Sequence, residues 1–312
     1  MREHRTAIFL LLILFSLSLS VPEIEIVKAE GTIYIRADGT VEGTDEIQRD
    51  GDTYNFISDI NGSIALERNN IVLNGTGYRL QGDGNENGIT LRDINNITVS
   101  NLKISNFNIG IVVMGSDDNT ILDNIVTENF RGLDLTASEN NTISENYIAY
   151  NTDGIALENM YNNIVENTIT NNSNFGIFLN GAGYNNIIGN NITNNGRGIL
   201  VSICYNNVIH HNNFVNNTNH VETDDSNGIW DNGEEGNYWS DYNGIDTDDD
   251  GIGDTPYVID ENNRDNYPLM EPTIIPEFPS WTPLLITLVA VVAVAVIYRQ
   301  KMSKSDKRGG NH

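Results

Sequence analysis

Apolar and polar positions alternate in one fixed phrase from about residue 70 to residue 217. Each phrase begins with a glycine that is followed by two apolar residues two positions apart. These glycines recur at an invariant spacing of 22: Gly88, Gly110, Gly132, Gly154, Gly176 and Gly198. A second phrase between them places apolar residues and asparagines at fixed offsets, first complete at Ile121, Asn124, Val126, Asn129. A fixed period of this length indicates a structural repeat.

The residue types within the repeat predict strands and turns. Apolar residues come in period-2 pairs and are largely β-branched, and no segment carries the 3.6-residue period of a helix. If each unit is one turn of a coil, residue i lies over residue i+22 at the strand spacing of about 4.8 Å. Asparagines on successive turns can then hydrogen-bond to one another. Parallel crossovers are right-handed, so the predicted fold is all-β, a single-stranded right-handed parallel β-helix of about 22 residues per turn.

The rest of the chain divides around this repeat. A basic start, an apolar run and a small-residue site predict a signal peptide, and a second apolar run before basic residues predicts a membrane helix with the protein on the outer face. The expected segments are a signal peptide 1–29, an N-terminal cap 30–69, β-helix repeats 70–221, an acidic C-terminal cap 222–271, a linker 272–283, a transmembrane or sorting helix 284–298 and a basic cytoplasmic tail 299–312. Within the repeats, Lys103 in an apolar column predicts a register shift after Asn96.

Charge narrows the possible partners. The chain has 17 Lys and Arg against 43 Asp and Glu, a formal net charge of −26. Such an acidic surface argues against nucleic acid and favours cations or neutral polymers. A single cysteine, Cys204, excludes an internal disulfide. Seven sequons predict a glycoprotein: Asn61, Asn74, Asn96, Asn140, Asn171, Asn191 and Asn216.

The repeat and its flanks resemble the NosD-like, carbohydrate-binding and sugar-hydrolysis (CASH) family of right-handed β-helices. The resemblance rests on the repeat, on residues 33–39 and 47–51 before it, and on residues 236–242, 254–260 and 266–270 after it. It implies carbohydrate binding, or copper delivery to nitrous oxide reductase. The run Ile275-Pro-Glu-Phe-Pro-Ser-Trp281, with the apolar and basic residues after it, resembles the archaeal PEF-CTERM sorting signal, which implies cleavage and exchange of the anchor. An uncleaved anchor is the alternative.

The acidic run from Asp246 to Asp254 predicts a calcium site. Carboxylates at the first, third, fifth and ninth positions and glycine at the sixth match the first part of a calcium loop, where the seventh residue offers its carbonyl. The ligands would be Asp246, Asp248, Asp250, Ile252 and Asp254. The twelfth position is Tyr257, so an acidic ligand there must come from elsewhere, such as Asp260. A solvated acidic turn is the alternative.

Copper would require histidine, cysteine or methionine. His210, His211 and Cys204 fall within one coil turn, and His220 follows. Adjacent residues of a strand point to opposite faces, so His210 and His211 are not expected to face one ion, and surface histidines are the alternative.

An enzyme that hydrolyses polysaccharides needs two acidic side chains that point toward the same glycosidic bond. Asp134 and Glu158 are expected one coil turn apart on one face, near Phe178, where they could act as acid and base on a glycosidic bond. Residues 151–154 and 115–118 echo two polygalacturonase motifs, but in the wrong chain order and without the remaining elements. A second column of carboxylates, Asp123, Glu145 and Glu166, predicts a solvated face or a cation site.

These observations favour a cell-surface, non-catalytic scaffold that binds carbohydrate or a cell-envelope component. A copper-handling accessory protein and a polysaccharide lyase or glycoside hydrolase are the alternatives.

Overall fold

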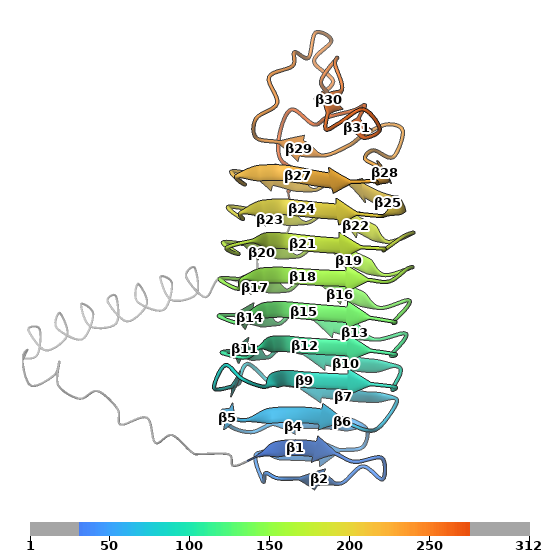
Figure 1. Ribbon diagram of the computed structural model, residues 1–312. Helices are drawn as coiled ribbons and strands as arrows, with labels where there is room; N and C mark the ends of the chain where they lie inside the picture. The colour runs from blue at the N-terminus through green and yellow to red at the C-terminus, as the bar shows by residue number, and fades with distance from the viewer. Residues whose placement is uncertain (1–30, 275–312) are drawn as a thin grey trace, which may run out of the picture.

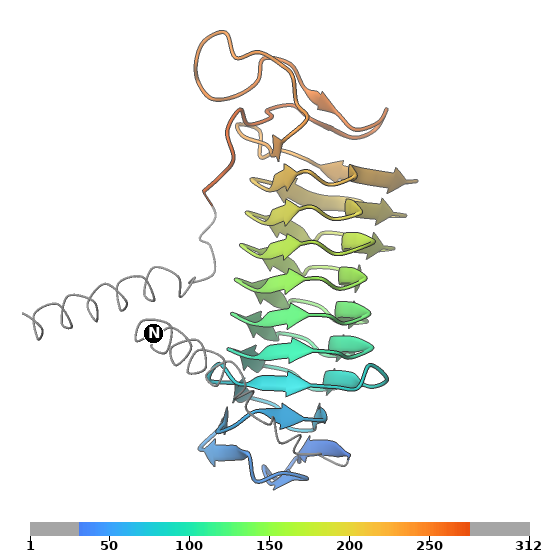
Figure 2. The ribbon, with the colours of Figure 1, turned by 90° about the vertical axis from the view of Figure 1, so that its left-hand side faces the viewer.

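The computed structural model describes residues 31–274, which form a coil of strands built from three sheets that are parallel apart from β2 and β3 at their start. Each full coil turn contributes one strand to each sheet, so the sheets run along the coil as three faces (Figures 1 and 2). The fold is the predicted right-handed parallel β-helix of about 22 residues per turn.

Neighbouring strands in most of each sheet come from successive coil turns. Sheet 1 contains β2 (Val41–Glu42), β1 (Thr32–Ile35), β6 (Ser63–Leu66), β9 (Asn87–Arg92), β12 (Ile109–Met114), β15 (Arg131–Thr136), β18 (Asp153–Glu158), β21 (Phe175–Asn180), β24 (Arg197–Ser202) and β27 (Asn219–Asp224). Sheet 2 contains β28 (Asn227–Ile229), β25 (Tyr205–His210), β22 (Asn186–Ile188), β19 (Asn163–Val165), β16 (Thr142–Ser144), β13 (Thr120–Leu122), β10 (Ile97–Ser100), β7 (Ile71–Asn74), β4 (Thr53–Phe56) and β3 (Ile47–Asp50). Sheet 3 contains β29 (Tyr238–Trp239), β26 (Asn213–Val215), β23 (Asn191–Thr193), β20 (Thr168–Thr170), β17 (Tyr147–Ala149), β14 (Ile125–Thr127), β11 (Lys103–Ser105), β8 (Arg79–Gln81) and β5 (Ile60–Asn61). A separate hairpin pairs β30 (Tyr257–Val258) with β31 (Arg264–Asp265).

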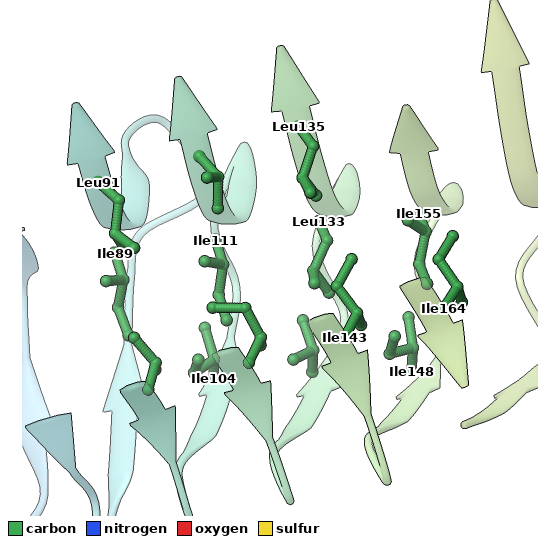
Figure 3. Packing of buried hydrophobic residues seen from close by; sticks show 14 of the residues in the cluster. Ile89, Leu91, Ile104, Ile111, Leu133, Leu135, Ile143, Ile148, Ile155 and Ile164 are labelled. Carbon is green, nitrogen blue, oxygen red and sulfur yellow. The ribbon is translucent and has the colours of Figure 1, made fainter. Parts of the chain in front are cut away.

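Stacked apolar side chains fill the inside of the coil. On sheet 1, Leu133 pairs with Ile111 below it and Ile155 above it, and all three are fully buried. Figure 3 shows these columns facing those of the other sheets. Each buried side chain of this size contributes about 1.5–3 kcal/mol, so the repeat supplies the core one layer at a time.

The repeat glycines allow adjacent coil turns to approach closely. A Cβ on Gly132 would lie 2.5 Å from the carbonyl oxygen of Gly154, and one on Gly154 would lie 2.3 Å from that of Gly176. No side chain fits at these distances, which explains why glycine recurs at this position.

The sheets begin before residue 70. β1 pairs in parallel with β6 in sheet 1, and β4 pairs in parallel with β7 in sheet 2, so residues 32–66 already contribute strands to the coil. The pairing offset to the preceding coil turn does change after Asn96, from 26 between β7 and β10 to 24 between β8 and β11, but Lys103 does not lie in an apolar column. Lys103 pairs with Arg79 and Ile125 in an outward-facing column, while its neighbour Ile104 is buried.

An aromatic cap covers the last coil turn. Trp239 is stacked between Phe214 and Tyr257, with ring centroids 4.4 and 4.2 Å away. The buried Asp265 accepts hydrogen bonds from the Trp239 indole nitrogen and the Asn237 backbone amide at 2.9 and 2.7 Å.

Several expected segments lie outside the described residues. They are the signal peptide, the sorting signal, the membrane helix, the basic tail and the linker beyond residue 274. Within residues 31–274, no helix is long and apolar enough to cross a membrane.

Candidate functional sites

The outer face of sheet 1 carries a network of charges and aromatic rings. Arg131, at the start of β15, bonds to Asp134 at 2.5 Å and approaches Asp153 on β18 at 3.8 Å. Asp153 is buried and also accepts a bond from the Asn174 amide at 2.9 Å. The two carboxylates are therefore held around one guanidinium group.

The aromatic part of this face lies two coil turns further on. Phe175 and Phe178 of β21 stack with centroids 5.3 Å apart. Arg197 lies over the Phe175 ring at 5.2 Å, donates to Asn174 at 3.0 Å and forms an ion pair with Glu222. The face thus combines apolar ring surfaces with fixed donors and acceptors.

The expected acid pair lies one coil turn apart on sheet 1, on the diagonal that the sequence predicts. Asp134 pairs across the strands with Ala156, and Glu158 pairs with Thr136, so the two acids occupy a diagonal with Cα atoms about 8 Å apart. Asp134 bonds instead to Arg131 and to the Thr136 hydroxyl, while Glu158 is exposed.

The second column of acids lies at a corner of the coil, where the backbone is left-handed. Asp123, Glu145 and Glu166 have φ values of 56°, 54° and 56°. This left-handed conformation turns the chain before each buried asparagine. Burial raises the pKa of Asp123. The same corner position is Gly189 and then His211 on later coil turns, which decides the geometry of the histidine pair.

The two adjacent histidines face each other, contrary to the prediction. His210 ends β25, but His211 is a corner residue with φ 57°, so strand alternation does not apply. The two Nδ1 atoms lie 2.6 Å apart, and His211 Nε2 lies 2.6 Å from a carboxylate oxygen of Glu235. Burial, followed by the charge of His211, lowers the pKa of His210. A convergent imidazole pair is a suitable start for a copper site.

Cys204 takes no part in this pair. It occupies the corner between sheets 1 and 2, before β25, whereas His210 ends β25 six residues or roughly 20 Å of extended chain further on. Its sulfur accepts a hydrogen bond from the Ala182 backbone amide at 3.3 Å. On an earlier coil turn, the Ser138 hydroxyl oxygen accepts the equivalent bond from the Ser116 backbone amide. Burial raises the pKa of the thiol, so Cys204 is a structural residue.

His220 belongs to the cap instead. Its Nδ1 faces the Asn217 amide nitrogen, and its Nε2 lies 3.3 Å from both Ser240 Oγ and an Asp241 carboxylate oxygen. The Asn217 side-chain oxygen accepts a hydrogen bond from Asn195, so it is the Asn217 side-chain nitrogen that faces His220 Nδ1. Because that nitrogen is a donor, Nδ1 must be the unprotonated acceptor, and the imidazole proton is on Nε2. These residues and Tyr257 line a cavity of about 570 Å³.

The acidic loop gathers three of the expected ligands. Asp246, Asp248 and Asp250 each place one carboxylate oxygen within 4.8 Å of the others. Repulsion from Asp250 raises the pKa of Asp248, as expected for clustered acids without a counter-charge. These oxygens fit a calcium ion.

The loop lacks a twelfth-position acid. Asp260 bonds to Thr223 and to Asn263, and Asp254 accepts a bond from the Thr247 amide. Tyr257 stacks on Trp239. Neither Asp260 nor Tyr257 therefore completes the ligand set.

The sequons lie on outward positions. Asn96, Asn140, Asn171 and Asn216 are exposed at left-handed corners. The remaining three are partly exposed: Asn61, Asn74 and Asn191.

Several residues of these sites were not predicted from the sequence. Arg131, Asp153 and Arg197 each begin a strand of sheet 1, one residue before a repeat glycine, and the period could have grouped them. Glu235 lies in the cap, where no repeat predicts its position.

Comparison with known proteins places the chain in a family. The family model described as "Periplasmic copper-binding protein (NosD)" matches residues 46–244. No curated protein matches the chain.

Similar solved structures include three enzymes. The periplasmic alginate epimerase AlgG has 18% identity and a TM-score of 0.41, with 55% of this chain and 51% of that chain covered. The A-module of the Azotobacter vinelandii mannuronan C-5 epimerase AlgE4 has 14% identity and a TM-score of 0.41, with 64% and 70% covered. Pectate lyase Pel9A has 15% identity and a TM-score of 0.39, with 60% and 63% covered. The chain thus spans about half the length of the AlgG epimerase.

The family match extends over most of the described coil and into the cap, and the family's description as periplasmic supports export of this protein. Because the matched region exceeds half of the chain, the protein belongs to the NosD family.

Proposed function

We propose that this NosD-family protein binds carbohydrate, without cleaving it, on the outer face of sheet 1. The observation that carries the proposal is the stacked pair of Phe175 and Phe178 beside Arg197 and Asn174. Aromatic faces pack against the apolar faces of sugar rings, and guanidinium and amide groups bond to hydroxyls.

Arg131 supports binding rather than cleavage. Glycosidic hydrolysis requires one free carboxylic acid and one free carboxylate on either side of the bond. Asp134 and Asp153 are both engaged by Arg131, so each is held as a structural acceptor.

A matched pair of variants tests this proposal. Phe178→Leu introduces the residue that Leu200 supplies in the same column, so the fold should be kept while the ring is lost. We expect about tenfold weaker binding to the oligosaccharides that the wild type binds, since 1.4 kcal/mol lies within the range of an aromatic contact. Val165→Ser on sheet 2, matched to Ser144, is the control. Unchanged affinity in Phe178→Leu, or reducing ends or unsaturated products from the wild type, would contradict the proposal.

Copper binding is a second candidate, favoured by the His210–His211 geometry and supported by the family's description. The two Nδ1 atoms would be ligands, and Glu235 would orient His211 through its other nitrogen. His211→Gly introduces the residue found at position 189 of the same corner column. We expect this variant to lose a copper equivalent in a spectroscopic titration, and equal copper binding by variant and wild type would reject the site.

We also propose that Asp246, Asp248 and Asp250 bind calcium and stiffen the cap. Asp248→Ala removes one ligand, whereas Asp249→Asn removes a charge outside the cluster at a left-handed position that asparagine tolerates. Calorimetric titration should show weaker Ca²⁺ binding in the first variant alone. No loss of affinity in Asp248→Ala would exclude the calcium site.

A further inference from the structure

One corner between sheets 1 and 2 is a residue shorter than the corners on either side. The strands β15 and β18 pair at an offset of 22, but the next buried asparagines, Asn141 and Asn162, are joined at an offset of 21. A residue is therefore missing between Glu158 and Asn162. On the neighbouring coil turns its place is filled by Ala137 and Gly181, and the following asparagine bond restores the count with an offset of 23.

The missing residue leaves a cavity in the surface. The cavity has a volume of about 410 Å³. Its walls include Ala137 and Gly181 from the flanking coil turns, together with Glu139, Glu158, Asn159 and Met160. Sheet 1 remains in register across this point, since Leu157 still pairs with Leu135 and Leu179. Sheets 2 and 3 of this coil turn therefore pair with the preceding turn at an offset of 21, and one extra residue between Asn172 and Gly176 restores the offset of 22 in sheet 1.

Asn159 has an unmet hydrogen bond in this cavity. Its side chain is 6% exposed, and its amide nitrogen has no hydrogen-bond partner. The equivalent residues on other coil turns are small and paired, as with Ser138 and Cys204. Buried amide groups are normally satisfied, so an unpaired donor on a residue that lines a cavity is consistent with a ligand that accepts a hydrogen bond there.

An exposed aromatic pair lies on the same corner. Tyr161 follows the cavity residue Met160, and its ring stacks on Tyr184 of the next coil turn with centroids 5.3 Å apart and planes 18° apart. Both rings are about half exposed. Elsewhere in this column the residue is polar, as at Asn140 and Asn206, so the coil itself does not require tyrosine here.

We propose that this cavity binds an uncharged sugar ring of a glycan. The carboxylates of Glu139 and Glu158 would accept bonds from its hydroxyls, and the Asn159 amide would donate to one of its oxygens. The Tyr161–Tyr184 pair would pack against the next ring. The two carboxylates disfavour uronates, whose charge has the same sign. The ligand class rests on the proposed carbohydrate binding, and Glu158 at the end of β18 puts the cavity at the edge of sheet 1.

Two variants remove the site without disturbing the core. Inserting one glycine between Glu158 and Asn159 restores the length of the neighbouring corners and fills the cavity. Tyr184→Asn breaks the aromatic pair and introduces the residue found at Asn140 and Asn206. Tyr150→Asn is the matched control, because Tyr150 is 59% exposed at a left-handed position on a different corner, the one between sheets 3 and 1.

The probes are fluorescently labelled gluco-, manno- and galacto-oligosaccharides, with oligouronates for comparison. We expect both site variants to bind the preferred neutral oligosaccharide at least fivefold more weakly than the wild type, the control to bind it equally, and oligouronates to bind poorly. Thermal unfolding midpoints identify any variant that has lost its fold. Undiminished binding by a folded Tyr184→Asn, or a preference for oligouronates, would overturn the cavity proposal.

The Phe178→Leu variant separates the two proposals. If Phe178→Leu weakens binding and the corner variants do not, the cavity proposal fails and the sheet 1 proposal stands. If the corner variants weaken binding and Phe178→Leu does not, the cavity proposal stands and the sheet 1 proposal fails. If the wild type binds none of the oligosaccharides, both fail.

Discussion

Buried asparagines solve the hydrogen-bonding problem of the corners. Asn146 accepts bonds from the amide and side chain of Asn124 at 2.9 and 3.1 Å, and it donates to the carbonyl of Ile121 at 2.8 Å. A corner cannot use the sheet ladder, so the side chain replaces it. This explains why asparagine recurs in a fold that otherwise selects β-branched residues.

Asn146→Ala should be strongly destabilising. It leaves the Asn124 amide and the Ile121 carbonyl buried without partners, at about 1–3 kcal/mol each. We expect a clear fall in the urea midpoint. Glu145→Asn, at an exposed left-handed position, should leave the midpoint nearly unchanged. A midpoint for Asn146→Ala equal to that of the control would disprove the structural role of the asparagine column.

At the scale of the strands, sheet 1 sets the period. Its six-residue strands keep an offset of 22 from β9 to β27, while the asparagine corners alternate between 21, 22 and 23. The stacked glycines explain this constancy, because their close contacts leave no space for a shift of the strands. Length differences therefore collect at the corners, where side chains are exposed and free to bind ligands.

Gly154→Ala tests this contact between β18 and β21. Its Cβ would lie 2.3 Å from the Gly176 carbonyl oxygen, so the two strands must separate. We expect a lower thermal midpoint, by several degrees. Gly189→Asn is the comparison, because its corner position accepts left-handed residues and the nearest atom to a new Cβ is 3.6 Å away. Equal midpoints for the two variants would show that the glycine contact does not limit the spacing.

At the scale of the whole molecule, the cap closes the end of the coil. The exposed backbone of a terminal coil turn would recruit other chains, and the Phe214, Trp239 and Tyr257 stack covers it. His220 connects the last coil turn to this stack through Ser240 and Asp241. Part of the contact between the coil and its cap therefore depends on the protonation of this buried histidine.

We expect the protein to lose stability at low pH through His220. Burial lowers its pKa from the ordinary 6.5, although Asp241 opposes the shift. Because the pKa of His220 is lower in the folded than in the unfolded state, neutral His220 contributes its full share of folding stability above pH 6.5. That stability is lost as the pH falls through the pKa of the folded state. Protonated Nδ1 would also oppose the Asn217 amide, a second donor. Unfolding midpoints at pH 7.5 and 5 should therefore fall more in the wild type than in His220→Gln, and parallel falls would contradict this role.

The repeat explains why the fold and several site positions could be predicted. A period of 22 places Asp134, Ala156 and Phe178 in one column, and the structure confirms that register. The cluster of Asp246, Asp248 and Asp250 was predictable for a different reason, since its carboxylates come from one short segment of the chain. Lys103 was misplaced because an alternating strand pattern read one residue out of step reverses every facing direction.

The sequence by itself determined the coil, its glycine contacts and its asparagine corners, because each depends on a residue stacking on its own repeat. Only the tertiary structure decided which polar groups meet. The histidine pair depends on a left-handed φ, the Arg131 network on side-chain reach across strands, and the corner cavity on one residue missing from a single coil turn. These contacts are made by residues that differ from one coil turn to the next. Their partners depend on how close the side chains lie in the folded chain, which the period of the repeat does not specify.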